Sequence, residues 1–142
     1  MRVFVDANVL FLAATSPVGR ASALLRLAEL GLFTPCASSH VIEEARRNVT
    51  ATARERLDDF ARLADGVERI AEAPAKLVSW AAGLGLSAND APVLAAAAAA
   101  GATGLVTGDR SNFGHLFGKG VGGVRAGSLG EALGFILERA ED

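Results

Sequence analysis

Residues 87–113 read SANDAPVLAAAAAAGATGLVTGDRSNF and decide the fold of this chain. Ser87 or Asn89 is a suitable cap for a helix, and Pro92 suits the first turn of that helix. The alanine run that follows predicts that the helix continues for several turns. Residues 104–107, GLVT, are apolar on both faces, as in a buried strand of a parallel sheet. The stretch therefore predicts a helix followed by a buried strand.

Each of these two elements carries an aspartate at one end. Asp90 lies in the first turn of the predicted helix, and Asp109 follows the strand directly after Gly108. In an open α/β sheet, helix starts and the carboxyl ends of strands lie along one edge, where ligands bind. We therefore expect Asp90 and Asp109 to share an acidic site.

A second buried strand is predicted at residues 2–5, RVFV, which ends at Asp6. Its β-branched and aromatic side chains leave no polar face, which is typical of a central strand. Asp6 is thus another carboxylate at a strand end, with Asn8 beside it. Glu43 and Glu44 lie near a helix start that follows two serines, at roughly the spacing of a helix cap.

The remaining elements follow from apolar spacing and turn residues. Helices are predicted over residues 20–31, 40–65 (one or two helices), 74–83 and 128–140, the last with Leu129, Leu133, Ile136 and Leu137 facing inward. Residues 32–37 and 67–71 predict short strands, and Pro35 confines the first to a strand end or a sheet edge. Residues 118–127 predict a flexible loop with a last edge strand at 124–126. They match G-x-G-x-x-G but lack its strand, turn and helix context, which argues against a nucleotide site.

Composition bounds the class of protein. The chain has 142 residues, of which 51% are hydrophobic and 21% charged, which predicts one compact domain over residues 1–142 rather than disorder. A net charge of −2 argues against wholesale coating by nucleic acid. Cys36 is the only cysteine, so a reducing cytoplasm is the simplest expectation. The uncharged residues 91–108 are mostly alanine and glycine between carboxylates, and we expect no membrane association.

Four acidic positions are therefore predicted to meet, namely Asp6, Glu43 or Glu44, Asp90 and Asp109. Clustered carboxylates repel one another and are costly to desolvate, so they need a cation. Oxygen ligands favour Mg²⁺ or Mn²⁺ over zinc. Such an ion activates water and clamps phosphate oxygens, which predicts phosphodiester hydrolysis. Each acid alone also has a structural interpretation, as a complement to a helix dipole or as a turn former. Their coincidence favours a shared site.

Three segments together resemble the successive motifs of PIN-domain nucleases, of the VapC-like toxin ribonuclease type. They are VDANVLFLA at residues 5–13, SSHVIEEARRN at 38–48, and SANDAPVLAAAAAAGA running into LVTGDRSNFG at 87–114. The resemblance implies a three-layer α/β/α sandwich with a central, mostly parallel sheet. It also implies an endoribonuclease that needs Mg²⁺ or Mn²⁺ and acts on single-stranded RNA. For toxin members it implies an antitoxin protein as partner and a homodimer.

The resemblance assigns the metal to Asp6, Asp90 and Asp109, with Glu44 as a further ligand or as the base that deprotonates water. Glu44 is preferred to Glu43 because the following EARR resembles the family pattern.

The polar residues Asn8 and Thr107 match positions that support the acids or the waters of the metal. Arg46, Arg47 and Arg110 lie near the acids in sequence and have two interpretations, phosphate contact or a solvated, ion-paired role.

One position departs from the family pattern. Asn112 stands where many relatives have a further acid after TGD, so the second metal position lacks a charge. This feature favours an alternative function, a non-catalytic PIN-like module that binds RNA or another partner. A receiver-like domain with a phosphorylated strand-end aspartate is a further alternative, weakened by the lack of a lysine after a late strand.

Overall fold

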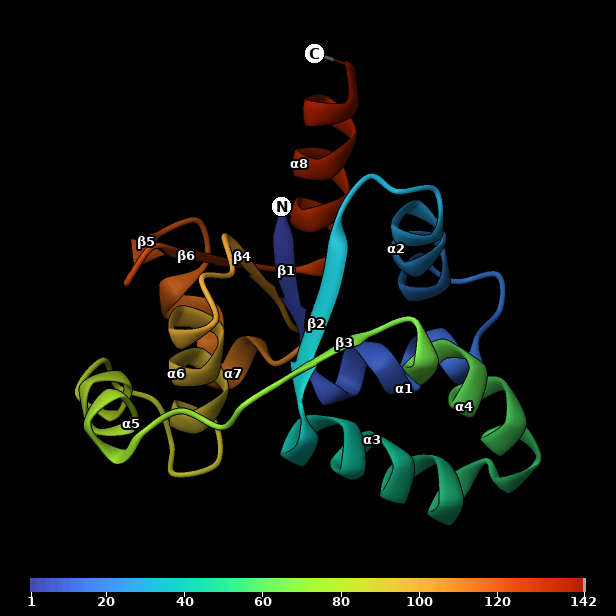
Figure 1. Ribbon diagram of the computed structural model, residues 1–142, viewed down its shortest axis with the longest axis horizontal. Helices are drawn as coiled ribbons and strands as arrows, with labels where there is room; N and C mark the ends of the chain where they lie inside the picture. Colours follow the sequence, from blue (N-terminus) through green and yellow to red (C-terminus); the bar gives the residue numbers. More distant parts are fainter. Residues whose placement is uncertain (142) are drawn as a thin grey trace.

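A six-stranded sheet between two groups of helices forms the centre of the computed structural model, which describes residues 1–141 (Figure 1). The strand order is β3-β2-β1-β4-β6-β5, and all neighbours are parallel except the antiparallel pair β5 and β6. The strands are β1 (Arg2–Val5), β2 (Thr34–Ser38), β3 (Glu68–Ile70), β4 (Gly104–Val106), β5 (Gly120–Val121) and β6 (Val124–Gly127). The predicted α/β sandwich with a mostly parallel sheet is confirmed.

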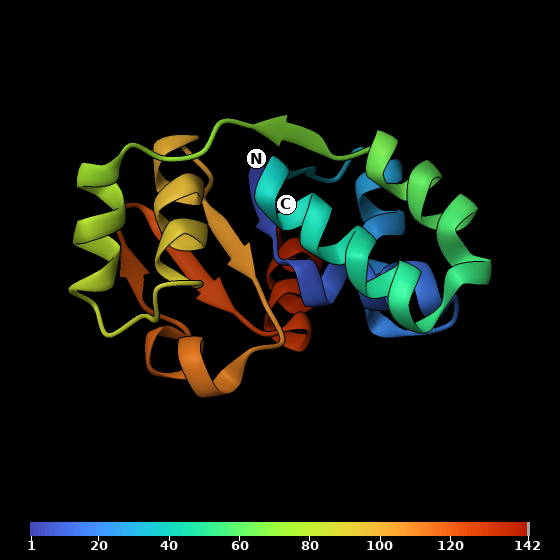
Figure 2. The same ribbon diagram turned by 90° about the horizontal axis from the view of Figure 1, so that it is seen from below.

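The helices lie on both sides of this sheet. They are α1 (Ala7–Thr15), α2 (Arg20–Glu29), α3 (Ser39–Thr52), α4 (Leu57–Asp65), α5 (Ala75–Ala82), α6 (Ala91–Ala99), α7 (Arg110–Phe113) and α8 (Leu129–Glu141), with short 3₁₀ turns η1 (Arg54–Arg56) and η2 (Gly114–Leu116). Figures 1 and 2 show α5 and α6 on one side of the sheet, and α1, α2 and α4 on the other. In the part of the chain that the structure describes, no helix combines the length and the apolar character needed to cross a bilayer.

The core explains why the central strands carry no polar face. Phe4 and Val5 of β1 and Leu105 of β4 are at most 1% exposed, because helices cover both faces of these strands. Helix α6 is apolar all round, as a helix must be when it is packed between a sheet and a second helix. Pro35 lies near the start of β2, before the pairing with β3 begins at Cys36, so its missing N–H leaves no gap on that side.

Residues 118–127 form a hairpin, which corrects the expected flexible loop. Strand β6 lies between β4 and β5, so it is not the edge strand of the sheet. Gly122 and Gly123 make the two-residue turn with φ of 57° and 80°. Positive φ at both central positions is what the commonest hairpin turns require, and glycine adopts it without steric cost.

The C-terminal helix is less buried than its sequence predicts. Ile136 is 1% exposed, whereas Leu129 and Leu133 are half-buried and Leu137 is 46% exposed. The expectation that Leu137 faces inward is therefore wrong. Helix α8 stands beside α2 at the top of Figure 1 and packs on the sheet mainly along β4 and β6, which leaves Leu137 exposed.

Candidate active site

A polar pocket of about 250 Å³ lies where several strands end. Strands β1, β2 and β4 run downward in Figure 1, and α1, α3 and α7 follow them. The pocket lies among the starts of α1, α3, α6 and α7. It is lined by Asp6, Asn8, His40, Val41, Glu44, Asn48, Ser87, Asn89, Asp90, Val93, Asp109 and Asn112. The structure thus brings the four acids Asp6, Glu44, Asp90 and Asp109 to one pocket, with Asn8 and Asn112 beside them.

Asp6 is the most buried of these acids, with 6% of its surface exposed. Its Oδ1 caps α1 by accepting a hydrogen bond of 2.8 Å from the Ala7 amide, and its Oδ2 accepts one of 2.8 Å from the Thr107 hydroxyl. The pKa of Asp6 is raised to about 6, mainly by burial and to a smaller extent by the negative charges of Asp90 and Glu44, which together outweigh the lowering effect of the two hydrogen bonds. The site thus holds a carboxyl whose charge is only partly compensated by the chain itself.

Thr107 and Asn8 connect the ends of β1 and β4. The Thr107 hydroxyl accepts hydrogen bonds from the Asp109 amide at 3.1 Å and from the Asn8 side-chain amide at 3.4 Å. The side-chain carbonyl of Asn8 in turn accepts a hydrogen bond from the Gly108 backbone amide at 2.9 Å. Thr107 is fully buried, so these bonds fix the position of Asp6 relative to Asp109. Thr107 does not line the pocket but supports it from behind.

Asp109 caps α7 and is held by its neighbours along the chain. Its carboxylate accepts hydrogen bonds from the Asn112 side chain at 2.8 Å, the Asn112 amide at 3.2 Å and the Ser111 hydroxyl at 2.9 Å. The side-chain bond from Asn112 is the main reason that the pKa of Asp109 lies below its usual range. Asn112 therefore donates to an acid of the pocket, where an acid at the same position would repel it.

Asp90 is the N-cap residue of α6 but makes no side-chain cap hydrogen bond. Its Oδ2 instead accepts from the Ser87 hydroxyl at 2.8 Å. The expected cap residues, Ser87 and Asn89, precede the helix and line the pocket. A carboxylate that does not cap its own helix remains available to a ligand.

The structure separates the two adjacent glutamates of α3. Glu44 lines the pocket, whereas Glu43 accepts from the Arg46 guanidinium at 3.2 Å on another side of the helix. Arg46 also lies over the ring of Phe60, 5.6 Å from its centroid. Arg110 likewise lies over Phe117, so two of the three arginines near the acids are engaged with aromatic rings.

Several pocket residues were not singled out from the sequence as site residues. His40 and Asn48 lie one turn before and one turn after Glu44 on α3, so the spacing of 40, 44 and 48 places all three on one helix face. This i, i+4 pattern is the signal that identifies them once Glu44 is assigned. The spacing alone does not identify site residues, because the sequence does not say which side of α3 faces the pocket.

The donor set fits a hard divalent cation in its chemistry. The pocket presents carboxylate, amide and hydroxyl oxygens and one imidazole, and Mg²⁺ and Mn²⁺ prefer oxygen ligands. The raised pKa of the buried Asp6 carboxyl shows that its negative charge is unfavourable in the chain alone, and a bound cation would stabilise that charge. Among residues 1–141, however, no three acidic, histidine or cysteine side chains are already grouped as ligands of one ion.

A second cavity, of about 300 Å³, lies between α8 and the strands β1, β4 and β6. Backbone and apolar side chains form most of its wall, and its charged side chains are Arg125, Glu131 and Glu138. It contains none of the predicted acids. The acidic pocket is therefore the better candidate for chemistry, although it is the smaller of the two.

Comparisons with known proteins concern the sequence family and the fold. The sequence matches the model of the PIN domain family over residues 2–111. No curated protein matches the chain. The fold is similar to that of VapBC2 from Rickettsia felis bound to a DNA fragment from their promoter, with TM-score 0.67, 18% identity, and coverage of 90% of this chain and 98% of that chain.

Two further solved structures share the fold. PAE2754 from Pyrobaculum aerophilum has TM-score 0.66 and 18% identity over 100% of this chain and 91% of that chain. Mycobacterium tuberculosis VapC20, a toxin that cleaves the sarcin-ricin loop, has TM-score 0.53 and 19% identity over 77% of this chain and 92% of that chain. At such identities the likeness concerns the fold, while the family match extends over most of the sequence. The chain belongs to the PIN domain family.

Proposed function

We propose that this chain is a metal-dependent endoribonuclease that hydrolyses phosphodiester bonds of single-stranded RNA. The observation that carries the proposal is the convergence of four carboxylates, from four separate elements of a PIN domain, on one pocket. The pKa of Asp6, which burial raises, supports the proposal, because acids with strongly shifted pKa values are typical of functional sites. The cytoplasm is the compartment we propose, in line with a single buried cysteine.

In this proposal Asp6, Asp90 and Asp109 hold Mg²⁺ or Mn²⁺, and Glu44 is a further ligand or the general base. A bound divalent cation lowers the pKa of water and stabilises negative charge on phosphate oxygens. The chain itself orients the acids. Thr107 fixes Asp6, Asn112 fixes Asp109, and Ser87 fixes Asp90 through the hydrogen bonds described above.

Glu44 differs from the other three acids. Its carboxylate has no hydrogen-bond partner among the side chains and backbone that the structure describes, so a lone pair is available to accept a proton from the attacking water. Asn8, whose amide links to Thr107 and Gly108, keeps the loop after β4 in place and so holds Asp109 on the opposite wall.

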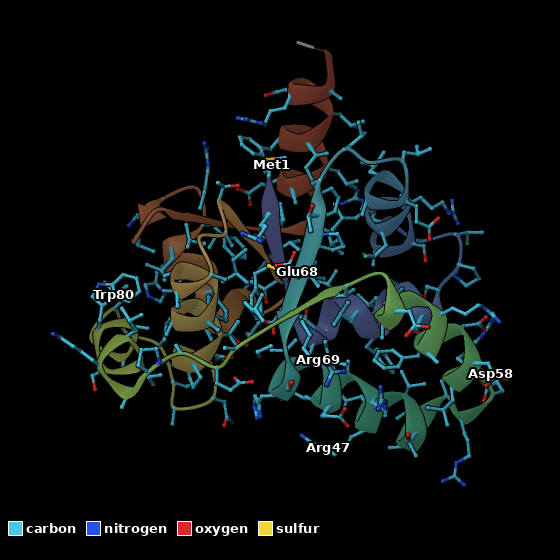
Figure 3. All side chains as sticks on the ribbon, in the orientation of Figure 1. Met1, Arg47, Asp58, Glu68, Arg69 and Trp80 are labelled. Atoms are coloured by element: carbon cyan, nitrogen blue, oxygen red, sulfur yellow. The ribbon has the colours of Figure 1, made fainter. Side chains whose placement is uncertain are left out.

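The test is cleavage of a mixed set of single-stranded RNAs in Mg²⁺, Mn²⁺ or EDTA. We expect the wild type to cut only with metal, and the double variant Asp6→Asn, Asp90→Asn to lose cutting while it stays folded. Asp58→Asn is the matched control, because Asp58 is an exposed acid on α4, away from the pocket (Figure 3). Undiminished cleavage by the double variant would refute the assignment of the acids.

We further propose that the chain acts as the toxin of a toxin–antitoxin pair. The support is its fold, shared with VapBC2, with VapC20 and with FitAB bound to a DNA fragment, the last at TM-score 0.55 and 17% identity over 89% of this chain and 94% of that chain. Induced expression should then arrest growth, and co-expression of the product of a neighbouring gene should relieve the arrest. Normal growth with soluble, RNA-cleaving protein would argue against a toxin.

A second candidate function, a non-catalytic RNA-binding or interaction module, is favoured by Asn112. Its side-chain amide donates a hydrogen bond to the Asp109 carboxylate and adds no charge of its own to the pocket. This candidate predicts RNA binding without cleavage in every divalent metal tested. Metal-dependent cleavage would exclude it.

A further inference from the structure

A nuclease pocket made of acids must still attract and hold a negatively charged substrate. Four carboxylates face the pocket, and the phosphates of RNA repel them wherever a bound cation does not lie between the two. Proteins that bind single strands compensate with cationic or hydrogen-bond-donating groups along the backbone path. Such groups are expected on the walls of the pocket or beside them.

His40 is the one lining side chain that can carry a positive charge, among the twelve residues given above for the pocket wall. Its backbone amide donates to the Glu72 carboxylate at 3.1 Å, which holds the start of α3 in place. Its imidazole is exposed and makes no hydrogen bond or ion pair within the described part of the chain. The ring is therefore anchored at the backbone but available at its nitrogens.

Two exposed arginines lie near α3. Arg69 of β3 reaches the start of α3, where its guanidinium donates weakly to the Ser39 hydroxyl at 3.4 Å. Arg47 lies two turns after His40 and one residue before Asn48, another pocket residue. Figure 3 shows Arg69 and Arg47 on opposite sides of α3. Both are exposed, and neither forms an ion pair among residues 1–141.

The other basic groups near the acids are engaged elsewhere. Arg46 pairs with Glu43 and stacks on Phe60, and Arg110 stacks on Phe117. The donors without an ion pair are thus His40 and Arg47 on α3, the helix that carries Glu44, and Arg69, which contacts the start of that helix.

We propose that His40, together with Arg47 and Arg69, forms a phosphate-binding edge that holds the RNA backbone beside the linkage to be cleaved. The inference rests on the proposed ribonuclease function and adds a substrate-binding role for residues outside the acid set. His40 donates an imidazole N–H to a phosphate oxygen at the pocket, and the two arginines contact phosphates further along the strand. The charged residues that line the pocket with His40 are Asp6, Glu44, Asp90 and Asp109, and Glu72 and Arg69 form hydrogen bonds with the start of α3.

The test compares His40→Ala, Arg47→Ala and Arg69→Ala with the wild type. Arg54→Ala is the matched control, because Arg54 is an exposed arginine beyond the far end of α3. Binding of a fluorescein-labelled single-stranded RNA is measured by anisotropy with Ca²⁺ replacing Mg²⁺ to slow turnover. Cleavage kinetics are measured in Mg²⁺ or Mn²⁺, and thermal melting checks that each exposed substitution leaves the fold intact.

We expect each of the three variants to raise Kd and KM by about 5- to 10-fold with kcat changed less than about 2-fold, because they remove binding but leave the acids. His40→Arg should restore binding, since it restores the donor. The slope of log K against log salt should fall by about 0.7 for each lost arginine contact on a single strand. Arg54→Ala should leave all of these quantities unchanged.

The outcomes separate this inference from the proposed function. Cleavage by the wild type with unchanged KM and Kd in all three variants would overturn the phosphate-binding edge and leave the nuclease standing. RNA binding without cleavage, lost in His40→Ala, would support the edge and overturn the nuclease. Absence of RNA binding by the wild type would overturn both.

Discussion

At the scale of single residues, the chemistry of this protein depends on Asp6. Its carboxyl is buried, accepts two hydrogen bonds and lies near the charges of Asp90 and Glu44. Desolvation outweighs the two hydrogen bonds, and the pKa rises from 3.8 to about 6. The charged form of Asp6 therefore destabilises the metal-free fold and is the form that a cation stabilises.

This gives a prediction for stability against pH. Because the pKa of Asp6 is higher in the folded than in the unfolded chain, the folded state binds this proton more tightly. The stability of the fold is therefore greatest, as far as Asp6 is concerned, below the unfolded pKa, and it falls as the pH rises through about 6. In EDTA, Asp6→Asn should therefore be more stable than the wild type by roughly 1–3 kcal/mol at pH 8 and by less than about 1 kcal/mol at pH 4. Urea unfolding at the two pH values measures the difference.

Magnesium supplies the control for the pH experiment. If the metal binds at Asp6, adding Mg²⁺ at pH 8 should stabilise the wild type more than Asp6→Asn and narrow the gap between them. A variant that is less stable than the wild type at pH 8 in EDTA would contradict the proposed balance of burial and hydrogen bonding.

Adjacent glutamates offer a matched pair for the catalytic role. Glu44 lines the pocket and Glu43 pairs with Arg46 outside it. Glu44→Gln should lower kcat by about 100-fold or more, in the range usual for a general base, whereas Glu43→Gln should keep kcat within about 2-fold. RNA cleavage kinetics at saturating Mg²⁺ compare the two. Equal effects of the two substitutions would show that the pocket-facing side of α3 is not where the chemistry occurs.

At the scale of elements, short turns do the positioning. Three acids come at or near helix starts that follow strands, so the boundary between strand and helix determines the position of each carboxylate.

The conformation of the β5–β6 hairpin likewise depends on a few residues, two glycines and a tryptophan. A Cβ added at Gly122 would lie 2.5 Å from Cη2 of Trp80 on α5, whereas one added at Gly123 would meet nothing within 4 Å.

The two glycines therefore predict different costs for the same substitution. Both have positive φ, so alanine at either position should destabilise the fold by about 1–2 kcal/mol through backbone strain. Gly122→Ala should cost about a further 1–3 kcal/mol, because Trp80 must move. Chemical unfolding followed by the fluorescence of Trp80, the single tryptophan, measures both. Equal stability of the two variants would mean that Trp80 does not pack on the turn.

The same elements show how much could be predicted from sequence. The central strands β1 and β4 are predictable because they are apolar on both faces and end at an aspartate, and the positions of Asp6 and Asp109 follow from those ends. For residues 118–127 the sequence predicts a loop with one edge strand rather than the observed hairpin, because the two strands are short and rich in glycine. The exposure of Leu137 was also not predictable, since apolar spacing does not tell how much of a helix its neighbours cover.

The site shows the same division. The acids are predictable from their places in the elements and from the resemblance to PIN nucleases, while their roles remain predictions. The position of His40 was not predictable, because it depends on which face of α3 turns to the pocket. The distinction between Glu43 and Glu44 likewise needs the rotation of that helix, which a single sequence does not specify.

At the scale of the whole molecule, topology creates the site. Strands β2, β1 and β4 are neighbours and parallel, so three chain segments far apart in sequence end at one edge. Helix α6 brings Asp90 to the same edge from one side of the sheet, and α3 brings Glu44 from another. Asp6 and Asp109 alone are ordinary helix caps and Glu44 an ordinary helix residue, and only the parallel sheet brings them together with Asp90 as a cluster with a net negative charge.

The most direct test of this account is therefore a calorimetric titration of the metal-free protein with Mn²⁺. We predict saturable binding by the wild type and by Asp58→Asn, weakened at least about 10-fold in each of Asp6→Asn, Asp90→Asn and Asp109→Asn, because all three carboxylates are proposed to hold one ion. Equal Mn²⁺ affinity in the wild type and the three pocket variants would contradict the claim that these acids form a single cation site.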